Sequence, residues 1–473
     1  MKRLCHYIKP WFLTRSICFL LAILQLLPLN AFALSPYSTR ELEELEKEFI
    51  QLINQSDSIE RNPLANQYIN HLGRQLARFA NIPPPYFFIV KSNEINAFAG
   101  PGGYIGFNSQ LILASESESE LAAVMAHELA HVRLHHLYSM IEHQKQMRIP
   151  MLASMLASVA LGVINPTLGT GAMMASLSGF TQDSINFTRA KEKEADRIGI
   201  KMLIKSGLDP RAMASFFKKM QQNSRYYYTA NTPAILRSHP LDEDRIAEAE
   251  NRSESLEKKI YPDNLNYHLF KEVIRVSTHT NSKQLLDFYQ YECLKKESGA
   301  ACRYGQVLTY LSLNQYQKAQ NLLIPLLNQD KDNLFYQIAM AQTESGSKQH
   351  AAALNRLAIL QTNYPDNYAA LMAYAQGLLA ANEGERAMNV LLKGSRQFKR
   401  DLPLCEALAQ AQSATNRKGY AYFTQAQCQL IQGRSRDAIQ QLRLAKTLAK
   451  DDQYLLARID ALIDEVKFFS EIK

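Results

Sequence analysis

Apolar residues recur at helical intervals in residues 38–80, so this stretch is predicted to form helices. Ser38 and Glu41 have the spacing of a capping box at its start. The apolar positions that follow are three or four residues apart: Leu42, Leu45, Phe49 and Ile53. After three prolines the pattern changes to the β-rich run 86–90, and the glycines of residues 96–107 suit a turn between strands. We therefore expect a small β-sheet, whose exposed edge strand would bind unfolded polypeptide as an added strand.

A second helical pattern covers residues 117–134. Ser117 and Glu120 have capping-box spacing at its start. Its apolar positions share one helical face: Leu121, Val124, Met125 and Leu129. A helix backed by such a face is a rigid mount for polar residues on its other side.

A 34-residue repeat begins near residue 300. It is marked by three Ala–Leu pairs: Ala319–Leu323, Ala353–Leu357 and Ala387–Leu391. Matching turns are expected at 332–333 and 366–367, and Gly433, Ala438 and Leu442, displaced by 51 residues, indicate a fourth unit. Tetratricopeptide repeats have this period and present a concave surface to a partner protein or an extended peptide. Unrelated amphipathic helices are the alternative, which the repeated spacing disfavours.

The N-terminal segment has the features of a secretory signal peptide covering residues 1–33. Four basic residues come first, the apolar run 17–29 follows, and Ala31-Phe32-Ala33 supplies a small-x-small cleavage site. The apolar run is short for a membrane span, and an uncleaved anchor is the alternative. The chain is therefore expected to be exported.

Length and composition favour two domains, residues 34–260 and residues 270–473, with a composition shift near residue 260. The exported chain of about 440 residues is long for a single core. Removal of residues 1–33 takes away four Lys/Arg and no Asp/Glu, which lowers the net charge from +8 to +4. This charge is too small to predict binding to nucleic acid.

Four cysteines remain after the signal peptide: Cys293, Cys302, Cys405 and Cys428. Disulfides persist in exported proteins, and the simplest pairing is Cys293–Cys302 with Cys405–Cys428. Such bonds would staple the repeat region. Free buried thiols are the alternative.

The helix at 117–134 contains His127-Glu128-x-x-His131. Residues four apart lie one above the other on a helix, so both imidazoles can face one metal ion while Glu128 lies on the neighbouring flank. A catalytic zinc needs neutral nitrogen ligands and a carboxylate that accepts a proton from its water. A chance match is the alternative. Leu134 and Leu137 stand where the metzincin variant has Gly and His, so the third ligand must come from elsewhere.

A second helical segment, residues 189–199, supplies the candidate for that ligand. Glu192 and Asp196 share one face with small residues that permit close packing, while Glu194 points away. We predict that Glu192 binds the metal and that Asp196 orients a ligand imidazole through its free N–H. A solvated charged face is the alternative.

Residues 149–180 form the most apolar stretch after the signal peptide. Pro166 interrupts it, whereas a membrane span needs about 20 uninterrupted apolar residues. We favour a helical hairpin packed near the site, placed to act as a lid between the two metal-binding helices. A membrane-dipping loop is the alternative.

These motifs, together with residues 96–105, Ser238-His239-Pro240 and Arg245, resemble the gluzincin family of the HtpX heat-shock protease and the CAAX prenyl endopeptidases. The resemblance implies a zinc metalloendopeptidase with one zinc ion per chain. The expected fold is mainly α: a zincin-type α+β domain with a small β-sheet over residues 34–260, then an α-helical tetratricopeptide-repeat solenoid over residues 270–473.

The resemblance also implies roles for two residues downstream. His239 precedes Pro240, so its segment, residues 237–240, is expected to be extended or a turn. Its imidazole would fill the fourth zinc position, displace the catalytic water and leave the enzyme latent. Arg245 is expected to stabilise the oxyanion. For His239, an ordinary surface histidine in a charged loop is the alternative.

Within the family, an exported chain with helical repeats resembles periplasmic members that act in outer-membrane quality control. This resemblance implies that the protein assists or degrades β-barrel proteins, including the lipopolysaccharide-transport barrel, that stall at the β-barrel assembly machinery. Association with the inner face of the outer membrane and peripheral membrane contact are further expectations. One alternative is a non-proteolytic chaperone or scaffold with a vestigial zinc site. Another is a general protease of misfolded proteins.

Overall fold

The computed structural model of this chain describes residues 39–139, 182–226, 234–256, 259–294 and 299–471. The predicted signal peptide, residues 1–33, and the predicted hairpin at 149–180 lie outside these residues. Among the described helices, none is both long and apolar enough to cross a membrane. The described part of the chain is mainly α-helical with one small sheet, which confirms the predicted fold class.

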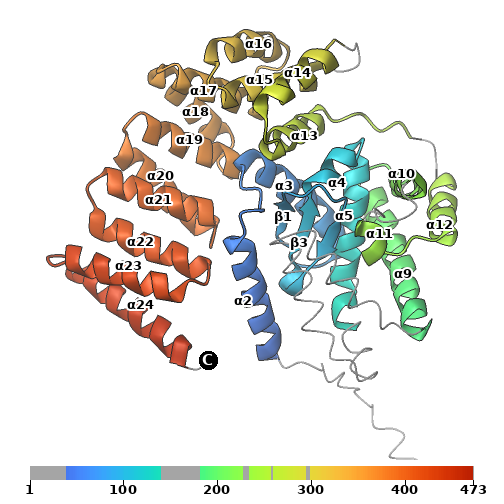
Figure 1. Cartoon of the computed structure of the whole chain (residues 1–473), viewed down its shortest axis with the longest axis horizontal. Helices are drawn as coiled ribbons and strands as arrows, with labels where there is room; N and C mark the ends of the chain where they lie inside the picture. Colours follow the sequence, from blue (N-terminus) through green and yellow to red (C-terminus); the bar gives the residue numbers. More distant parts are fainter. Residues whose placement is uncertain (1–38, 140–181, 227–233, 257–258, 295–298, 472–473) are drawn as a thin grey trace, which may run out of the picture. The chain divides into compact units, whose positions relative to one another are not determined.

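In the N-terminal half, helices surround a small sheet (Figure 1). The elements are α2 (Thr39–Gln55), α3 (Pro63–Ala80), β1 (Phe87–Val90), β2 (Ala97–Ala99), the 3-10 turn η1 (Pro101–Gly103), β3 (Ile105–Asn108), α4 (Ser109–Ala114), α5 (Glu118–Arg133), α9 (Gln182–Ser206), α10 (Ala212–Tyr226), α11 (Ala234–Ser238) and α12 (Glu243–Glu254).

The strands of the described residues form one sheet in the order β1-β3-β2, with β1 parallel and β2 antiparallel to β3. The outer edge of β1 is closed, because the Asn70 amide bonds both backbone groups of Phe87 (3.1 and 2.8 Å) and the Glu60 N–H donates to the Ile89 carbonyl (2.8 Å). Strand β2 forms the opposite edge and packs against α5. The edge nearest to His127 is therefore β2.

Helices α5 and α9 pack closely, and this contact builds the centre of the site. A Cβ atom at Gly199 would lie 3.3 Å from the backbone of Ala126 and His127, so glycine permits this approach. The Ser117 hydroxyl caps α5 by accepting from the Glu120 N–H (3.2 Å). The Glu120 carboxylate accepts instead from the Glu116 N–H (2.7 Å), so the predicted capping box is shifted by one residue.

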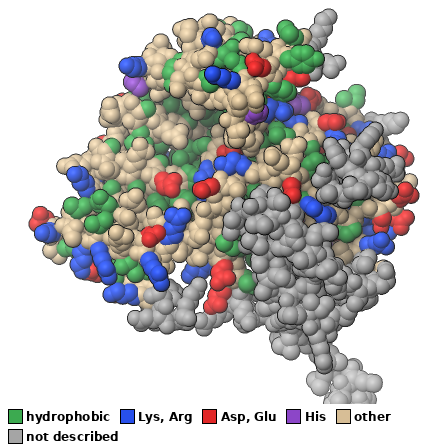
Figure 2. All heavy atoms as spheres, viewed as in Figure 1, with side chains coloured by type: hydrophobic (Ala, Val, Ile, Leu, Met, Phe, Trp, Pro, Cys, Tyr) green, Lys and Arg blue, Asp and Glu red, His purple; other side chains and the backbone are tan. Residues whose placement is uncertain are grey.

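Helical hairpins fill the C-terminal half (Figure 1). They are α13 (Leu265–Thr278), α14 (Ser282–Glu292), α15 (Gly299–Ser312), α16 (Tyr316–Gln329), α17 (Leu334–Gly346), α18 (His350–Asn363), α19 (Tyr368–Ala380), α20 (Gly384–Gln397), α21 (Leu402–Ala414), α22 (Lys418–Ile431), α23 (Ser435–Leu448) and α24 (Gln453–Glu471). Figure 2 shows basic side chains gathered over the last helices on the face in view.

The 34-residue period is visible in the backbone. The turns inside successive pairs each contain one residue with positive φ: Asn314, Lys348, Asn382 and Asn416. Asn333 and Asn367, in the predicted turns between pairs, accept hydrogen bonds from the first N–H groups of α17 and α19. The turns of the structure therefore recur at the 34-residue period that the sequence predicts.

The 34-residue spacing is interrupted in α22, where Gln425 occupies the position that Leu391 has in α20. Ala438 and Leu442 lie on the next helix, α23, where both are buried against α22 and α24. The turn between α22 and α23 contains Gly433 with positive φ, like the turns inside the earlier pairs. The predicted displacement of 51 residues, one repeat plus about one helix, therefore corresponds to α23.

Both predicted disulfides are present in the structure. Cys293 is bonded to Cys302 at the start of the repeat region, and Cys405 on α21 is bonded to Cys428 on α22. The free-thiol alternative is excluded for these four residues, and neither bond contacts the metal motifs.

Helix α13 joins the first helices to the repeats. The Phe270 ring stacks on Tyr68 of α3, with ring centroids 4.5 Å apart. The Tyr267 hydroxyl and the Lys271 ammonium both donate to the Ser115 carbonyl (3.0 and 2.6 Å). A single apolar core runs through these residues, from Leu64 of α3 to Ala370 of α19.

Candidate metal centre

Four side chains from three segments converge at one point. His127 and His131 come from α5, Glu192 from α9 and His239 from the residue after α11. One donor atom of each lies within 4.8 Å of the other three. The structure thus brings together all four residues that the sequence suggested as metal ligands.

The shortest distances between these donors are close to those expected around a tetrahedral metal ion. His127 Nε2 lies 3.0 Å from His131 Nε2, 3.2 Å from Glu192 Oε2 and 3.3 Å from His239 Nδ1. Glu192 is also 3.4 Å from His131 Nε2 and 3.1 Å from His239 Nδ1. Ligands on a tetrahedral zinc with bonds of about 2.0–2.1 Å are about 3.3 Å apart. Two His nitrogens, a carboxylate and a third imidazole are also a donor set that zinc prefers.

Glu128 lies on the flank of the four donors. Its side chain is 1% exposed, and among the described residues its Oε1 has no hydrogen-bond partner. The closest basic atom given by the structure is His239 Nε2, at 3.4 Å. A buried acceptor without a partner is costly, so this carboxylate is set to accept a proton or hydrogen bond from a group bound at the site.

Asp196 and Arg245 stand behind His127. Asp196 Oδ1 accepts from His127 Nδ1–H (2.8 Å), so Nε2 is the nitrogen that faces the other donors. The Arg245 guanidinium bonds both carboxylate oxygens of Asp196 (2.7 and 2.9 Å) and lies 3.1 Å from Glu192 Oε2. Asp196 therefore occupies the place expected of a residue that orients a ligand ring.

The location of Arg245 differs from the predicted role at the oxyanion. It is 2% exposed, and its remaining Nη1 contact is with the Pro240 carbonyl (2.7 Å). Because the guanidinium pairs with Asp196 and Glu192, its direct effect is on the metal ligands. The structure favours Arg245 as a positioning residue.

The segment before Pro240 also differs from the prediction. Arg237 and Ser238 are the last residues of α11, whereas only an extended or turn conformation was expected. His239 itself has left the helix, as its position before proline requires, although its N–H still donates to the Ile235 carbonyl (2.8 Å). The short helix directs this imidazole toward the other donors.

Charges within the site favour ionised carboxylates. Burial acts against the charged forms, but hydrogen bonds to Asp196 and Glu192 raise the pKa of His127 to about 10. Burial lowers the pKa of His131 well below its ordinary value. Burial acts against ionised Glu192 too, yet His239 and His131 hold its pKa well below the usual range. Glu192 is therefore anionic at neutral pH, and a metal ion at His127 has to displace a proton.

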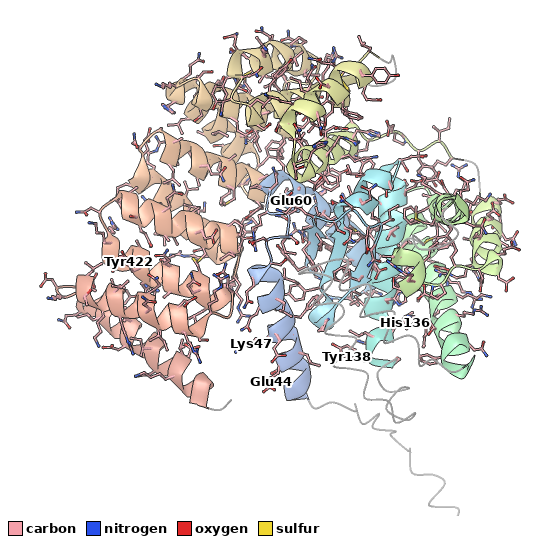
Figure 3. All side chains as sticks on the ribbon, in the orientation of Figure 1. Glu44, Lys47, Glu60, His136, Tyr138 and Tyr422 are labelled. Atoms are coloured by element: carbon pink, nitrogen blue, oxygen red, sulfur yellow. A yellow bond between two sulfur atoms is a disulfide. The ribbon has the colours of Figure 1, made fainter. Side chains whose placement is uncertain are left out.

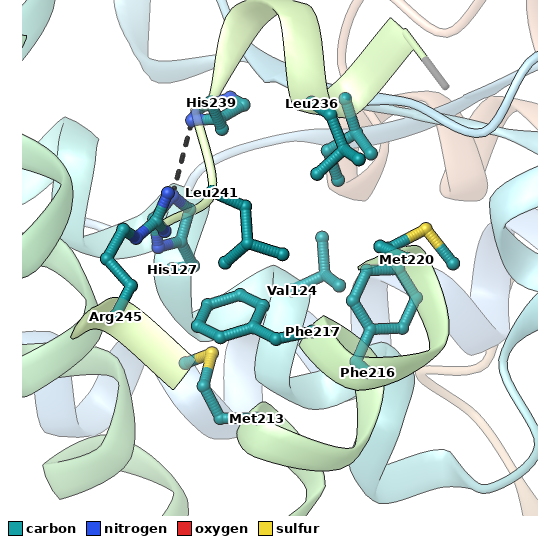
Figure 4. A pocket seen from close by; sticks show the side chains of 11 residues that line it. Val124, His127, Met213, Phe216, Phe217, Met220, Leu236, His239, Leu241 and Arg245 are labelled. Atoms are coloured by element: carbon teal, nitrogen blue, oxygen red, sulfur yellow. Dashed lines mark hydrogen bonds between the residues drawn. The ribbon is translucent and has the colours of Figure 1, made fainter. Parts of the chain in front are cut away.

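An apolar cavity of about 30 Å³ adjoins the donors (Figure 4). His127, His239 and Arg245 line one side of it. The other walls are apolar side chains, among them Val124, Phe216, Phe217, Met220 and Leu241.

Two polar neighbours of the site were missed from the sequence. His136 Nδ1 lies 3.0 Å from His131 Nδ1, and His136 Nε2 lies 3.4 Å from Glu194 Oε2. Glu194 does point away from the four donors, as predicted, but it contacts the ring behind one of them. The only signal in the sequence is a second histidine pair, His135-His136, directly after the metal motif.

Comparisons with known proteins place the chain in a family. Residues 63–253 match peptidase family M48. The chain is 32% identical over 432 residues to the beta-barrel assembly-enhancing protease of Escherichia coli K12, covering 89% of this chain and 87% of that protein. This chain is a member of peptidase family M48. It is accordingly a metalloprotease, and the metal-binding arrangement of His127, His131, Glu192 and His239 lies within the matched residues.

Other relatives of this M48 peptidase extend the comparison. A putative beta-barrel assembly-enhancing protease of Vibrio cholerae is 32% identical over 423 residues, covering 88% of this chain and 87% of that protein. A protease HtpX homolog of Methylibium petroleiphilum is 34% identical over 160 residues, covering 32% of this chain and 54% of that protein. Among solved structures, yeast Tom70 is 14% identical with a TM-score of 0.30, covering 77% of this chain and 82% of that chain. A TM-score this low establishes no shared fold.

Replacing Arg245 by Lys is expected to weaken metal binding by about tenfold. Partners behind metal-bound histidines typically contribute 10–100-fold to affinity, and a Lys ammonium cannot bond Asp196 through two parallel N–H groups. Competition with a chromophoric zinc chelator measures the change. The matched control is Arg252→Lys on the same helix, where the arginine is exposed and pairs with Glu248. Equal metal affinity in Arg245→Lys and the parent protein would contradict the positioning role.

Proposed function

We propose that this M48 peptidase is a periplasmic zinc endopeptidase that cleaves misassembled outer-membrane β-barrel proteins. The observation that carries the zinc assignment is the convergence of four N and O donors beside the buried Glu128 carboxylate, whose Oε1 accepts no hydrogen bond from any described residue. Harder ions such as Mg²⁺ favour oxygen ligands, whereas three of these four donors are imidazoles.

The residues around the site have separable tasks in peptide hydrolysis. Zinc in such a site acts as a Lewis acid that makes water acidic enough to lose a proton near neutral pH. Glu128 accepts that proton and then delivers it to the departing amine. Asp196 and Arg245 hold His127 and Glu192 in place while this happens. Glu128 is thus the general base and acid, and the other residues keep the donors oriented.

Three features of the chain suit an extended, apolar polypeptide as substrate. Strand β2 is the sheet edge beside α5, and an extended chain binds such an edge through its backbone. The cavity next to His127 has apolar walls. The repeats are a stack of helical hairpins of the kind that presents a concave surface to a partner. Unfolded β-barrel proteins supply extended segments with alternating apolar residues.

The cellular role rests on relatives and on the predicted signal peptide. The Escherichia coli relative is named for enhancing β-barrel assembly. By analogy, we place this protein at the β-barrel assembly machinery on the periplasmic side of the outer membrane, where it assists or removes stalled barrels, including the lipopolysaccharide-transport barrel. Peripheral membrane contact and the absence of nucleic-acid binding remain predictions. A scaffold with a vestigial site is disfavoured, because Glu128 and the donors are all present.

The proposal is tested with the purified protein lacking residues 1–33. We expect about one zinc ion per chain by elemental analysis, and cleavage of an unfolded outer-membrane β-barrel protein that stops when a chelator removes the metal and resumes when zinc is added. An unfolded soluble protein of similar length is the matched substrate. Equal cleavage of both substrates would favour the general protease of misfolded proteins, and a zinc-loaded protein that cleaves neither would contradict the proposal.

Replacing His239 by Ala is expected to raise basal proteolysis several-fold, including cleavage of the protein itself. His239 Nδ1 lies among the other three donors, so this imidazole competes with water for the fourth metal position. Chain fragments appearing on incubation, quantified by mass spectrometry, measure the effect. His268→Ala, a histidine in α13 outside the site, is the control. Loss of activity with metal retained would instead assign His239 to stabilisation of the transition state, and unchanged activity would exclude the latency role.

A further inference from the structure

His127 and His131 of α5 make different contacts through Nδ1, the ring nitrogen that faces away from the other donors. His127 donates to the buried carboxylate of Asp196, which Arg245 holds in turn. His131 contacts another imidazole, because its Nδ1 lies 3.0 Å from His136 Nδ1. His136 is 3% exposed and lies just beyond the end of α5 (Figure 3). A carboxylate, Asp196, therefore orients His127, whereas a second imidazole, His136, contacts His131.

A left-handed residue places His136 behind His131. Continued α-helix would put His135, four residues after His131, against that ring. Instead α5 ends at Arg133, and His135 has φ 53°, which turns the chain before the next helical turn begins. His135 is consequently exposed, and His136 is buried.

A metal ion bound at His131 Nε2 determines which nitrogens of the two rings carry protons. His131 Nε2 faces the other donors, so a metal ion bound there leaves the proton on Nδ1. That N–H then donates to His136 Nδ1, and His136 carries its own proton on Nε2. Glu194 Oε2 lies 3.4 Å from this second N–H and accepts it. An imidazole serves here because it accepts at one nitrogen and donates at the other.

We propose that His136 is a positioning residue of the metal site, which fixes the tautomer and orientation of His131, with Glu194 as a weaker outer support. The inference rests on the metal site of the proposed function and adds a residue outside its ligand set. Glu194 is the weaker element because its side chain is 46% exposed and it also pairs with Lys191 (3.5 Å). Its contact with His136, at 3.4 Å, is also longer than the 3.0 Å contact between His136 and His131.

Three substitutions in the full chain test this role. His136→Leu removes the acceptor, while His136→Asn keeps an amide oxygen near the place of Nδ1 that accepts from His131 and gives up the weaker contact with Glu194. His135→Asn changes the exposed neighbour, where asparagine tolerates positive φ. Zinc affinity is measured by chelator competition, and the thermal unfolding of each metal-free protein is recorded beside it.

We expect zinc affinity to fall by about 10–100-fold in His136→Leu, to recover most of this loss in His136→Asn and to stay at the parent value in His135→Asn. Similar unfolding temperatures of the metal-free Leu and Asn variants would assign the difference to the hydrogen bond. Parent affinity in His136→Leu, or equal losses in the Leu and Asn variants, would overturn the positioning role. A parent protein that binds no zinc would overturn the proposed function itself.

Discussion

Replacing Glu128 by Gln is expected to lower kcat by about 10²–10⁴-fold while zinc content stays unchanged. General-base catalysis contributes rate factors of this size, and an amide of the same shape cannot accept the proton. Metal binding should persist because Glu128 is outside the four donors and its Oε1 makes no hydrogen bond to any described residue. Steady-state cleavage of an unfolded substrate and elemental analysis of the same preparation measure the two quantities.

The matched control for this variant is Glu116→Gln. Glu116 precedes the same helix, and its side chain is 78% exposed, so the substitution changes charge without touching the site. Activity near the parent value is expected there. Substantial proteolysis by Glu128→Gln would exclude Glu128 as the base, and loss of zinc in that variant would show that its carboxylate contributes to metal binding.

Local periodicity explains why part of the site was predictable. His127, Glu128 and His131 lie within one helical turn and a half, so helix geometry alone places them. Glu192 and Asp196 followed from the small residues on their helical face, and Gly199 does lie against the α5 backbone. In each case one secondary-structure element determines where the side chains point.

The remaining site residues depend on tertiary structure. His239 is 112 residues from His127, and only the family resemblance suggested that it approaches the metal. The pairing of the Arg245 guanidinium with Asp196 was not predicted, since no spacing in the sequence indicates it. His136 was missed because a positive φ at His135, a single backbone angle, changes which histidine faces inward.

The fold was more predictable than its boundaries. Repeats with a fixed period can be recognised in a sequence because small and large apolar residues recur at that period. The Ala–Leu pattern failed only in α22, where Gln425 stands in place of the expected leucine. The predicted domain boundary near residue 260 is not a boundary in the apolar core. Composition changes there, but the apolar core of the described residues continues across it from α3 and α4 into α13 and beyond.

This continuity predicts that residues 34–260 alone do not form a stable domain. A chain that ends at residue 260 lacks the aromatic partners of Tyr68, among them the stacked Phe270 ring. It also lacks the hydrogen bonds of Tyr267 and Lys271 to the Ser115 carbonyl. Loss of one large buried aromatic typically costs about 3–5 kcal/mol, while a whole domain is stable by about 5–15 kcal/mol. Several such losses together are expected to unfold the fragment.

A fragment of residues 34–397 should instead fold and bind zinc. It keeps the core through Ala370 and the contact between α3 and α19, where Gln67 accepts from the Tyr368 N–H (3.0 Å). Removing residues 435–473 from the full chain is the milder control, because most of the core of α23 and α24 is a separate cluster. Thermal unfolding by circular dichroism and zinc content distinguish the three proteins. A cooperative transition with bound zinc in 34–260 would show that the two predicted domains are independent, because the repeats would then contribute nothing essential to the fold that carries the metal.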